Sequence, residues 1–274
     1  MNINCKGKLI DLSTPKVMGI LNMTPDSFYD GGTLKSDRDV IGRTEKMLTE
    51  GATFIDVGGY SSKPNAKDVS EVEESQRVIP IIKLLVKNFP EILVSIDTFR
   101  SVVAKKAIEA GASMVNDISA GNLDENMFTT VRNLQVPYII MHMQGTPKTM
   151  QIDPTYADVT KDIVYYFSDK LNTLRKLGLN DIIIDVGFGF GKTLEQNYEL
   201  LNNLELFKNL EVPILAGVSR KSMLYNLLGT TPQKALNATT VANTIAVLYG
   251  SNILRVHDVN EALEAIKVVE ALRE

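Results

Sequence analysis

The chain has 274 residues, of which 44% are hydrophobic and 23% are charged. These values exclude a disordered chain, a collagen and a coiled coil, and they are typical of a globular protein with a large buried core. A net charge of −4 without basic blocks predicts no general affinity for nucleic acid or for an anionic membrane. Cys5 is the only cysteine, which excludes an intrachain disulfide and a cysteine-based metal site.

The amino-terminal region carries charged side chains and lacks the apolar stretch of a signal peptide. No apolar run in the chain approaches the roughly 18 residues that a membrane span needs. We therefore expect a soluble, cytoplasmic protein.

The chain begins with a predicted β-hairpin, in which Asn2–Cys5 and Leu9–Leu12 flank a Lys-Gly-Lys turn. Short apolar runs then alternate with longer amphipathic segments, a pattern that predicts βα units and a parallel sheet. The runs are Val17–Leu21, Phe54–Val57, Ile92–Ile96, Ser113–Val115, Tyr138–Met141, Ile182–Ile184, Ile214–Val218 and Ile253–Val256.

The segments between these runs predict helices, because their apolar residues recur at helical spacing. Capping-box patterns at Ser70–Glu73 and Asp258–Glu261 predict two helix starts. The predicted helices cover residues 37–50, 70–86, 101–110, 124–133, 156–177, 194–206, 233–249 and 258–269.

Eight strand–helix units without an interdomain linker predict an α/β fold, a (β/α)8 TIM barrel with a short N-terminal β-hairpin. An open doubly wound sheet with insertions is the alternative. We expect one domain that spans residues 1–274.

Active sites of such barrels lie at the carboxyl ends of the strands, and here every predicted strand carries or precedes a polar group. The acidic groups Asp56, Asp97, Asp117 and Asp185 offer acceptors for N–H groups or for a cation. Lys221, Arg255 and His257 come from the last two strands, a frequent phosphate site in barrels. We therefore expect a substrate that combines an N–H-rich polar ring with a phosphate-type anion.

Some motifs do not predict a site. The run Gly187–Thr193 ends like a phosphate-binding P-loop, but Val186 stands where that motif needs its first glycine. His142 and His257 are too isolated for a zinc site. We expect His142 to be packed or hydrogen-bonded, and His257 to be functional. The long glycine-containing loops after the first two strands are expected to be mobile lids.

Several segments, in order along the chain, resemble the signatures of the dihydropteroate synthase family. The first signature corresponds to Gly19–Phe28 and the second to Asp56–Pro64. The resemblance continues through Ser95–Thr98, Val115–Ile118, Asp185–Lys192, Gly217–Ser222 and Arg255–Asp258. The match extends over essentially the whole chain from Val17.

The resemblance implies that the protein condenses 6-hydroxymethyl-7,8-dihydropterin pyrophosphate with p-aminobenzoate, releasing pyrophosphate and forming 7,8-dihydropteroate. It further implies Mg²⁺ as cofactor, a homodimer, and a dissociative mechanism in which the pterin becomes a cation before the amine attacks. Two alternative hypotheses remain: a pterin-binding barrel of the methyltransferase type, and a non-catalytic pterin-binding protein.

The resemblance also assigns roles to residues of this sequence. The implied pterin site is Asp97, Asn116, Asp185, Lys221 and Arg255, with apolar walls from Met141, Ile118 and Phe190. The implied pyrophosphate site is Asn22, Ser62, Lys63, Arg255 and His257, with Asn22 near the Mg²⁺. The implied p-aminobenzoate site is Ser219, Phe28, Pro64, Lys221 and Phe190. The implied catalytic residues are Asp97, Lys221, Arg255, His257 and Asp30.

The chain departs from the family pattern in the second signature, which usually reads Ser-Thr-Arg-Pro-Gly and here reads Ser61–Asn65 as Ser-Ser-Lys-Pro-Asn. Lys63 keeps the positive charge but lacks the planar fork of arginine. The departure bears on how tightly this loop holds pyrophosphate and Asp30.

Overall fold

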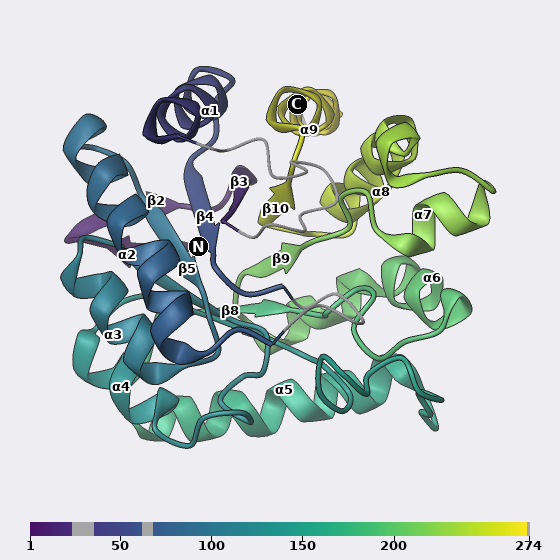
Figure 1. The fold of residues 1–274 in the computed structure, drawn as a ribbon. Helices are drawn as coiled ribbons and strands as arrows, with labels where there is room; N and C mark the ends of the chain where they lie inside the picture. The colour runs from purple at the N-terminus through teal and green to yellow at the C-terminus, as the bar shows by residue number, and fades with distance from the viewer. Residues whose placement is uncertain (24–35, 62–67, 273–274) are drawn as a thin grey trace.

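The computed structural model describes residues 1–23, 36–61 and 68–272. Within them, parallel strands close into a barrel in the order β10-β3-β4-β5-β6-β7-β8-β9 (Figure 1). The strands are β3 (Lys16–Asn22), β4 (Phe54–Gly58), β5 (Val94–Asp97), β6 (Met114–Asp117), β7 (Tyr138–Met141), β8 (Ile182–Asp185), β9 (Ile214–Ala216) and β10 (Ile253–Val256). The predicted (β/α)8 barrel is confirmed, and closure between β10 and β3 excludes the open sheet.

Helices surround the barrel as an outer ring (Figure 1). They are α1 (Asp37–Thr49), α2 (Glu71–Asn88), α3 (Ser101–Glu109), α4 (Met127–Leu134), α5 (Val159–Lys176), α6 (Leu194–Asn202), α7 (Ser222–Leu227), α8 (Leu236–Leu248) and α9 (Val259–Glu270). The predicted helix 194–206 is wrong at its end: α6 stops at Asn202, and Leu204–Leu210 forms the 3-10 helix η1. A second short 3-10 helix, η2 (Pro232–Lys234), precedes α8.

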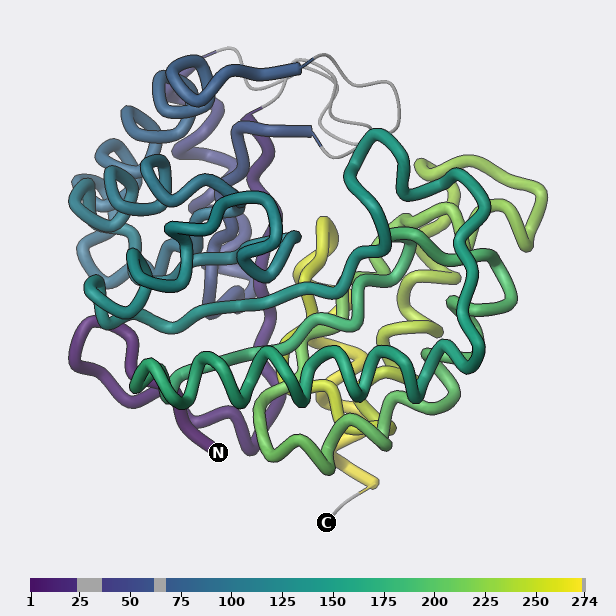
Figure 2. Tube along the Cα trace, turned by 90° about the horizontal axis from the view of Figure 1, so that it is seen from below, coloured from purple at the N-terminus to yellow at the C-terminus, as the bar shows by residue number. Residues whose placement is uncertain are grey.

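The predicted amino-terminal hairpin is confirmed as β1 (Asn2–Cys5) paired antiparallel with β2 (Lys8–Asp11). Its apolar residues Ile3 and Cys5, with the following Leu12, are buried against the first inward-facing side chains of the barrel strands, such as Met18 and Phe54. The hairpin therefore closes the amino-terminal end of the barrel, at the lower edge of the view in Figure 2. The carboxyl-terminal end of the barrel is not covered by this hairpin, and it is the end at which an active site can lie.

Successive side chains of each strand alternate between the barrel interior and the layer beneath the helices. In β4, Ile55 and Val57 pack in the outer core, whereas Phe54 belongs to the interior cluster. Asp56 lies between two outward residues and therefore faces inward. The same alternation directs four further side chains toward the barrel interior, above its apolar layer: Asp97, Asn116, Asp185 and Arg255. Because all of them face inward, the polar groups lie close together.

Candidate active site

The Arg255 guanidinium on β10 is held between two carboxylates from other strands. Its Nε donates to Asp56 Oδ2 at 2.6 Å, and a terminal nitrogen donates to Asp97 Oδ2 at 2.7 Å. Asp56 is fully buried and also accepts a hydrogen bond of 3.1 Å from the Asn116 amide. Four strands on one side of the mouth, β10, β4, β5 and β6, are thus linked through hydrogen bonds between polar side chains.

This arrangement perturbs the ionisation of its members. Burial raises the pKa of the Asp97 carboxyl, although the neighbouring Arg255 opposes the rise. Burial alone would lower the pKa of Arg255, but the Asp56 and Asp97 carboxylates raise it above its ordinary value. Arg255 is therefore a permanent cation whose orientation is fixed by two acceptors.

Asp185 and Lys221 form the opposite wall. Asp185, at the end of β8, accepts a backbone hydrogen bond of 2.8 Å from Gly187 on Oδ1, and its Oδ2 accepts none from the described part of the chain. Burial raises the pKa of Asp185, an effect that Lys221 opposes. Burial also lowers the pKa of Lys221 to about 8, and Asp185 opposes that shift. The pair presents an open carboxylate oxygen beside an ammonium of moderate acidity.

Lys221 is oriented by the loop after β8. Its Nζ donates to the carbonyl of Phe188 and lies 4.7 Å from the centre of the Phe190 ring. The Phe190 ring is half-buried and continues into an apolar cluster. That cluster consists of Ile118, Met141, Met143 and Met150, with Phe99 and Phe190 packed against it. Ile118, Met141 and Phe190 were predicted as apolar walls, and the structure brings them together.

Ser219 and His257 lie side by side where β9 and β10 end. The Ser219 hydroxyl lies 3.1 Å from His257 Nδ1 and accepts a hydrogen bond of 3.2 Å from the His257 backbone N–H. Burial and, to a smaller extent, the nearby Arg255 lower the pKa of His257 to about 3. His257 is therefore a neutral hydrogen-bonding group, and the positive charge of this corner comes from Arg255 and Lys221.

The predicted capping box at Asp258–Glu261 is wrong. Asp258 makes no side-chain cap on α9, and both of its oxygens accept from the buried Arg220 guanidinium, at 2.8 and 2.9 Å. Arg220 also donates to the backbone carbonyls of Pro232 and Gln233. Ion pairing outcompetes local capping, and the pair ties together the two loops that carry Lys221 and His257.

Asp117 was predicted to face the mouth, and this is also wrong. Its carboxylate lies in the outer layer, where it accepts from the Ser119 backbone N–H, the Gly121 N–H and the Tyr138 hydroxyl. Strand alternation places Asn116 inside the barrel and Asp117 outside it. Asp117 therefore supports the β6–α4 loop rather than a ligand.

Asn22 ends β3 at the mouth and is half-buried. A Cβ atom placed on Gly58 would lie 3.4 Å both from Asn22 Oδ1 and from Asp97 Cβ, so the absent side chain keeps these two residues close. No cluster of three or more His, Cys, Asp or Glu side chains suited to a metal occurs in the described ranges. The Asn22 side-chain oxygen is a donor of the kind that Mg²⁺ takes when waters and substrate phosphates supply its other ligands.

Five predicted site residues lie outside the described residues, and their roles stay predictions: Phe28, Asp30, Ser62, Lys63 and Pro64.

The prediction that His142 is hydrogen-bonded is confirmed, because its Nδ1 lies 3.0 Å from Lys192 Nζ. Asp56 was predicted as an acceptor at the mouth but was given no substrate to bind, and Arg220 was given no role. The signal for Asp56 was a carboxylate in the middle of a buried apolar strand.

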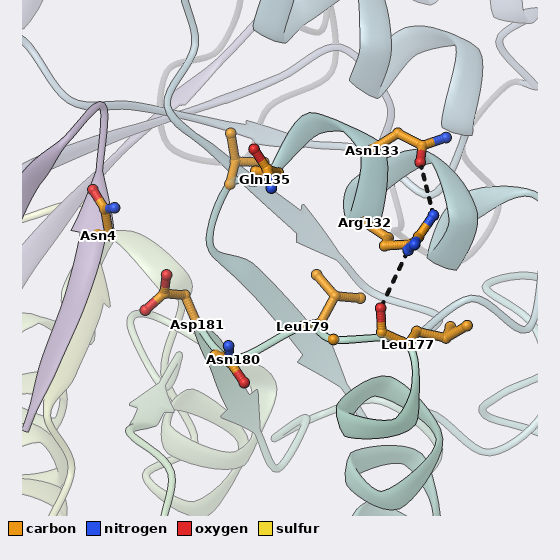
Figure 3. A pocket seen from close by; sticks show the side chains of 10 residues that line it. Asn4, Arg132, Asn133, Gln135, Leu177, Leu179, Asn180 and Asp181 are labelled. Atoms are coloured by element: carbon orange, nitrogen blue, oxygen red, sulfur yellow. Dashed lines mark hydrogen bonds between the residues drawn. The ribbon is translucent and has the colours of Figure 1, made fainter.

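A separate pocket of about 650 Å³ lies at the other end of the barrel, lined by Asn4 of β1 and Asp181, which precedes β8 (Figure 3). Arg132 borders it and donates to the carbonyl of Leu177 at 3.3 Å. Because this pocket lies at the amino ends of the strands, none of the clustered polar groups of the mouth reaches it.

In the described ranges, no helix has the length and apolar composition to cross a membrane.

Residues 18–257 match the family described as "Pterin binding enzyme". The dihydropteroate synthase of Escherichia coli strain K12 is 42% identical over 273 residues, covering 99% of this chain and 96% of that protein. The structure of the Yersinia pestis dihydropteroate synthase with a sulfonamide drug complex aligns with a TM-score of 0.96 at 41% identity, covering 100% of this chain and 99% of that one. The Xanthomonas albilineans enzyme in complex with 7,8-dihydropteroate aligns with a TM-score of 0.88 at 35% identity, covering 100% and 99%.

Proposed function

The chain belongs to the dihydropteroate synthases, a family of pterin-binding transferases, and from this premise we propose which of its residues carry out the reaction. The reaction joins 6-hydroxymethyl-7,8-dihydropterin pyrophosphate to p-aminobenzoate and gives 7,8-dihydropteroate and pyrophosphate, a step of folate synthesis.

The pterin binds between the two walls of the mouth. Asp185 accepts from the 2-amino group and N3–H of the ring, a fork that a carboxylate binds in a bidentate manner. Asp97 and Asn116 bind the opposite edge, and Lys221 reaches the carbonyl side. The Arg255 guanidinium lies against the ring face, and Met141, Ile118 and Phe190 cover the apolar surface. The single observation that carries this assignment is Asp185 Oδ2, a buried-site acceptor without a hydrogen bond in the described chain, beside Lys221.

The diphosphate binds near Arg255 and His257, where a permanent cation and a neutral imidazole lie two residues apart at the end of β10. Asn22, Ser62 and Lys63 complete the proposed set. Asn22 is the residue that would contact Mg²⁺, which when bound would neutralise charge on the departing diphosphate.

We propose that the C–O bond to the diphosphate breaks before the new bond forms. The bond electrons leave with pyrophosphate, and Arg255 stabilises that developing charge. Asp97 stabilises the positive pterin left behind. The p-aminobenzoate nitrogen then attacks the exocyclic carbon and loses one proton. The Ser219 hydroxyl meets the p-aminobenzoate carboxylate, with Lys221 and Phe190 beside it, and Phe28, Pro64 and Asp30 complete the pocket.

The assay that tests this proposal follows pyrophosphate release from dihydropterin pyrophosphate, with and without p-aminobenzoate, and identifies the product by mass. Release that depends on p-aminobenzoate and yields dihydropteroate is the expected result. Pterin binding without release would support the non-catalytic alternative, and methyl transfer without release would support the methyltransferase type.

We also propose that the protein forms a homodimer. Exposed apolar side chains lie at the end of α7 and along α8, two helices that contact each other: Leu227, Leu228, Val241 and Leu248. Patches of this kind mark protein interfaces. Light scattering over a range of concentrations tests the proposal, and a monomer at every concentration would contradict it.

The single domain over residues 1–274 and the cytoplasmic location stay predictions.

A further inference from the structure

The loop between β8 and α6 is built from alternating glycines. Gly187, Gly189 and Gly191 have φ values of 72°, 80° and 65°, in the left-handed region that glycine tolerates best. A Cβ atom on Gly187 would lie 1.9 Å from the His142 carbonyl oxygen, and one on Gly191 would lie 2.8 Å from the Gln144 carbonyl oxygen. The loop therefore packs its backbone directly against the end of β7, and several of its carbonyls turn inward.

Lys192 lies at the centre of this loop and is 3% exposed. Its Nζ contacts the Gly187 carbonyl at 2.9 Å, the Phe190 carbonyl at 3.0 Å, His142 Nδ1 at 3.0 Å and, at the longer distance of 3.4 Å, the His142 carbonyl. An ammonium group has three N–H donors, enough for the three shortest of these contacts. A neutral amine has two N–H donors and one lone pair, so it would suit these partners only if His142 carried its proton on Nδ1. The charged form instead pairs with a His142 ring protonated on Nε2, and burial lowers the pKa of Lys192 to about 7.

In the second pairing the His142 ring accepts from Lys192, and the ring is buried beside the rings of Tyr156 and Tyr166. Accepting on Nδ1 requires a neutral imidazole that carries its proton on Nε2. Burial, with a further contribution from Lys192, lowers the pKa of His142 to about 2, which agrees with that state. Lysine and histidine thus form a fixed donor–acceptor pair between β7 and the β8–α6 loop.

The same loop orients three groups of the active site. The Gly187 N–H holds Asp185 Oδ1, the Phe188 carbonyl holds Lys221 Nζ, and the Phe190 ring faces that same ammonium. Lys192 binds the carbonyls of Gly187 and Phe190, at both ends of this stretch. Its donors are directed at its own loop, so they are not available to a phosphate as they would be in a P-loop.

We propose that Lys192, with His142 as its acceptor, is a positioning residue for pterin recognition, because it fixes the loop that orients Asp185, Lys221 and Phe190. The inference rests on the proposed assignment of those three residues to the pterin. It explains why a charged side chain is buried beside a site that it does not enter.

The first test is Lys192→Met, which keeps the length of the side chain and removes its donors. Calorimetry with a pterin ligand should show a dissociation constant raised at least about tenfold, with a stoichiometry still near one. KM for dihydropterin pyrophosphate should rise more than kcat falls. The matched control is Lys170→Met, which removes the hydrogen bond of a half-buried lysine to Asn122 on the outside of the barrel and should leave both constants unchanged.

A second pair of variants tests the acceptor. His142→Asn retains an oxygen near the position of Nδ1, whereas His142→Leu offers none. Pterin affinity should fall more in the leucine variant, with partial rescue in the asparagine variant. Nitrogen NMR is direct because the chain has two histidines, and His142 should be neutral with its proton on Nε2 from pH 5 to 8.

The outcomes separate this inference from the proposed function. Failure of the wild-type protein to bind a pterin or form dihydropteroate would overturn the proposed function itself. If the wild type is active, one result for Lys192→Met would overturn the inference. That result is a loss of stability and of binding stoichiometry with an unchanged dissociation constant for the pterin, because it would show a merely structural role. If Lys192→Met does not fold, equal affinities of the two His142 variants overturn it, as does a proton on Nδ1.

Discussion

At the scale of single residues, the site is determined by which oxygen atoms already have partners. Asp56 Oδ2 accepts two hydrogen bonds, from Arg255 and Asn116. Asp97 accepts one from Arg255, and Asp185 accepts one from a backbone N–H. Asp56 Oδ1 has no partner in the described chain, but Asp56 is fully buried beneath its neighbours and supports them. Asp97 and Asp185 retain acceptor capacity for a ligand at the mouth.

Replacing Asp185 with asparagine should abolish most pterin binding. The amide presents a donor to a ligand N–H, and such a buried mismatch costs about 1–3 kcal/mol or more. Calorimetry with a pterin analogue should show at least about a tenfold loss of affinity. Asp181→Asn, at the other end of β8, is the control and should bind normally. Unchanged affinity in Asp185→Asn would contradict the assignment of this carboxylate.

Catalysis should decline as the pH rises through about 8, the value to which burial lowers the pKa of Lys221. Because the lowered pKa belongs to a cation, the protonated form that donates to the pterin predominates below that pH and is lost above it. A profile of kcat/KM against pH reports this group in the free enzyme. In Lys221→Arg the alkaline limb of this profile should shift to a much higher pH. If the limb does not shift, the loss of activity at high pH belongs to another group.

At the scale of elements, the buried Arg220–Asp258 pair joins the β9–α7 loop to the β10–α9 loop. Asp258→Asn should lower the free energy of unfolding by about 3–5 kcal/mol, because it leaves a buried guanidinium without its counter-charge. It should also lower kcat/KM, since Lys221 and His257 lie on the two joined loops. Urea unfolding and steady-state kinetics measure these effects.

The surface pair of the exposed Lys46 and the partly buried Glu50 provides the control for that experiment. Lys46→Ala should change stability by less than about 1 kcal/mol and leave the kinetics intact. The double variant Arg220→Met with Asp258→Leu should recover part of the stability lost in Asp258→Asn, because no charge remains buried. A stable, fully active Asp258→Asn protein would show that the pair positions nothing.

At the scale of the whole molecule, stability and function occupy opposite ends of the barrel. Ile3→Ala should remove about 2–5 kcal/mol from the free energy of unfolding, because Ile3 is buried in the hairpin that closes the amino-terminal end. Pterin affinity should stay unchanged in the folded protein. The exposed Val72→Ala substitution on α2 is the control for side-chain truncation. A lost pterin affinity in Ile3→Ala would show that the two ends are coupled.

Much of this protein could be predicted from its sequence. The alternation of apolar runs with amphipathic segments determined the barrel, because each βα unit must bury its own strand against its own helix. Polar groups after the strands located the mouth, and the family signatures identified the reaction. Each of these properties is local or repeats along the chain, so a linear pattern records it.

The tertiary structure decided how the polar groups are partnered. Asp258 fits a helix cap in sequence but pairs with Arg220, because a buried guanidinium 38 residues away offers two charged hydrogen bonds. Asp117 and Asn116 are neighbours in the chain, yet strand alternation sends one beneath the helices and the other into the barrel. Lys192 resembles a phosphate-binding lysine but donates to His142 and its own loop. Hydrogen-bond partners depend on distances between strands that only barrel closure sets, and no local pattern encodes those distances.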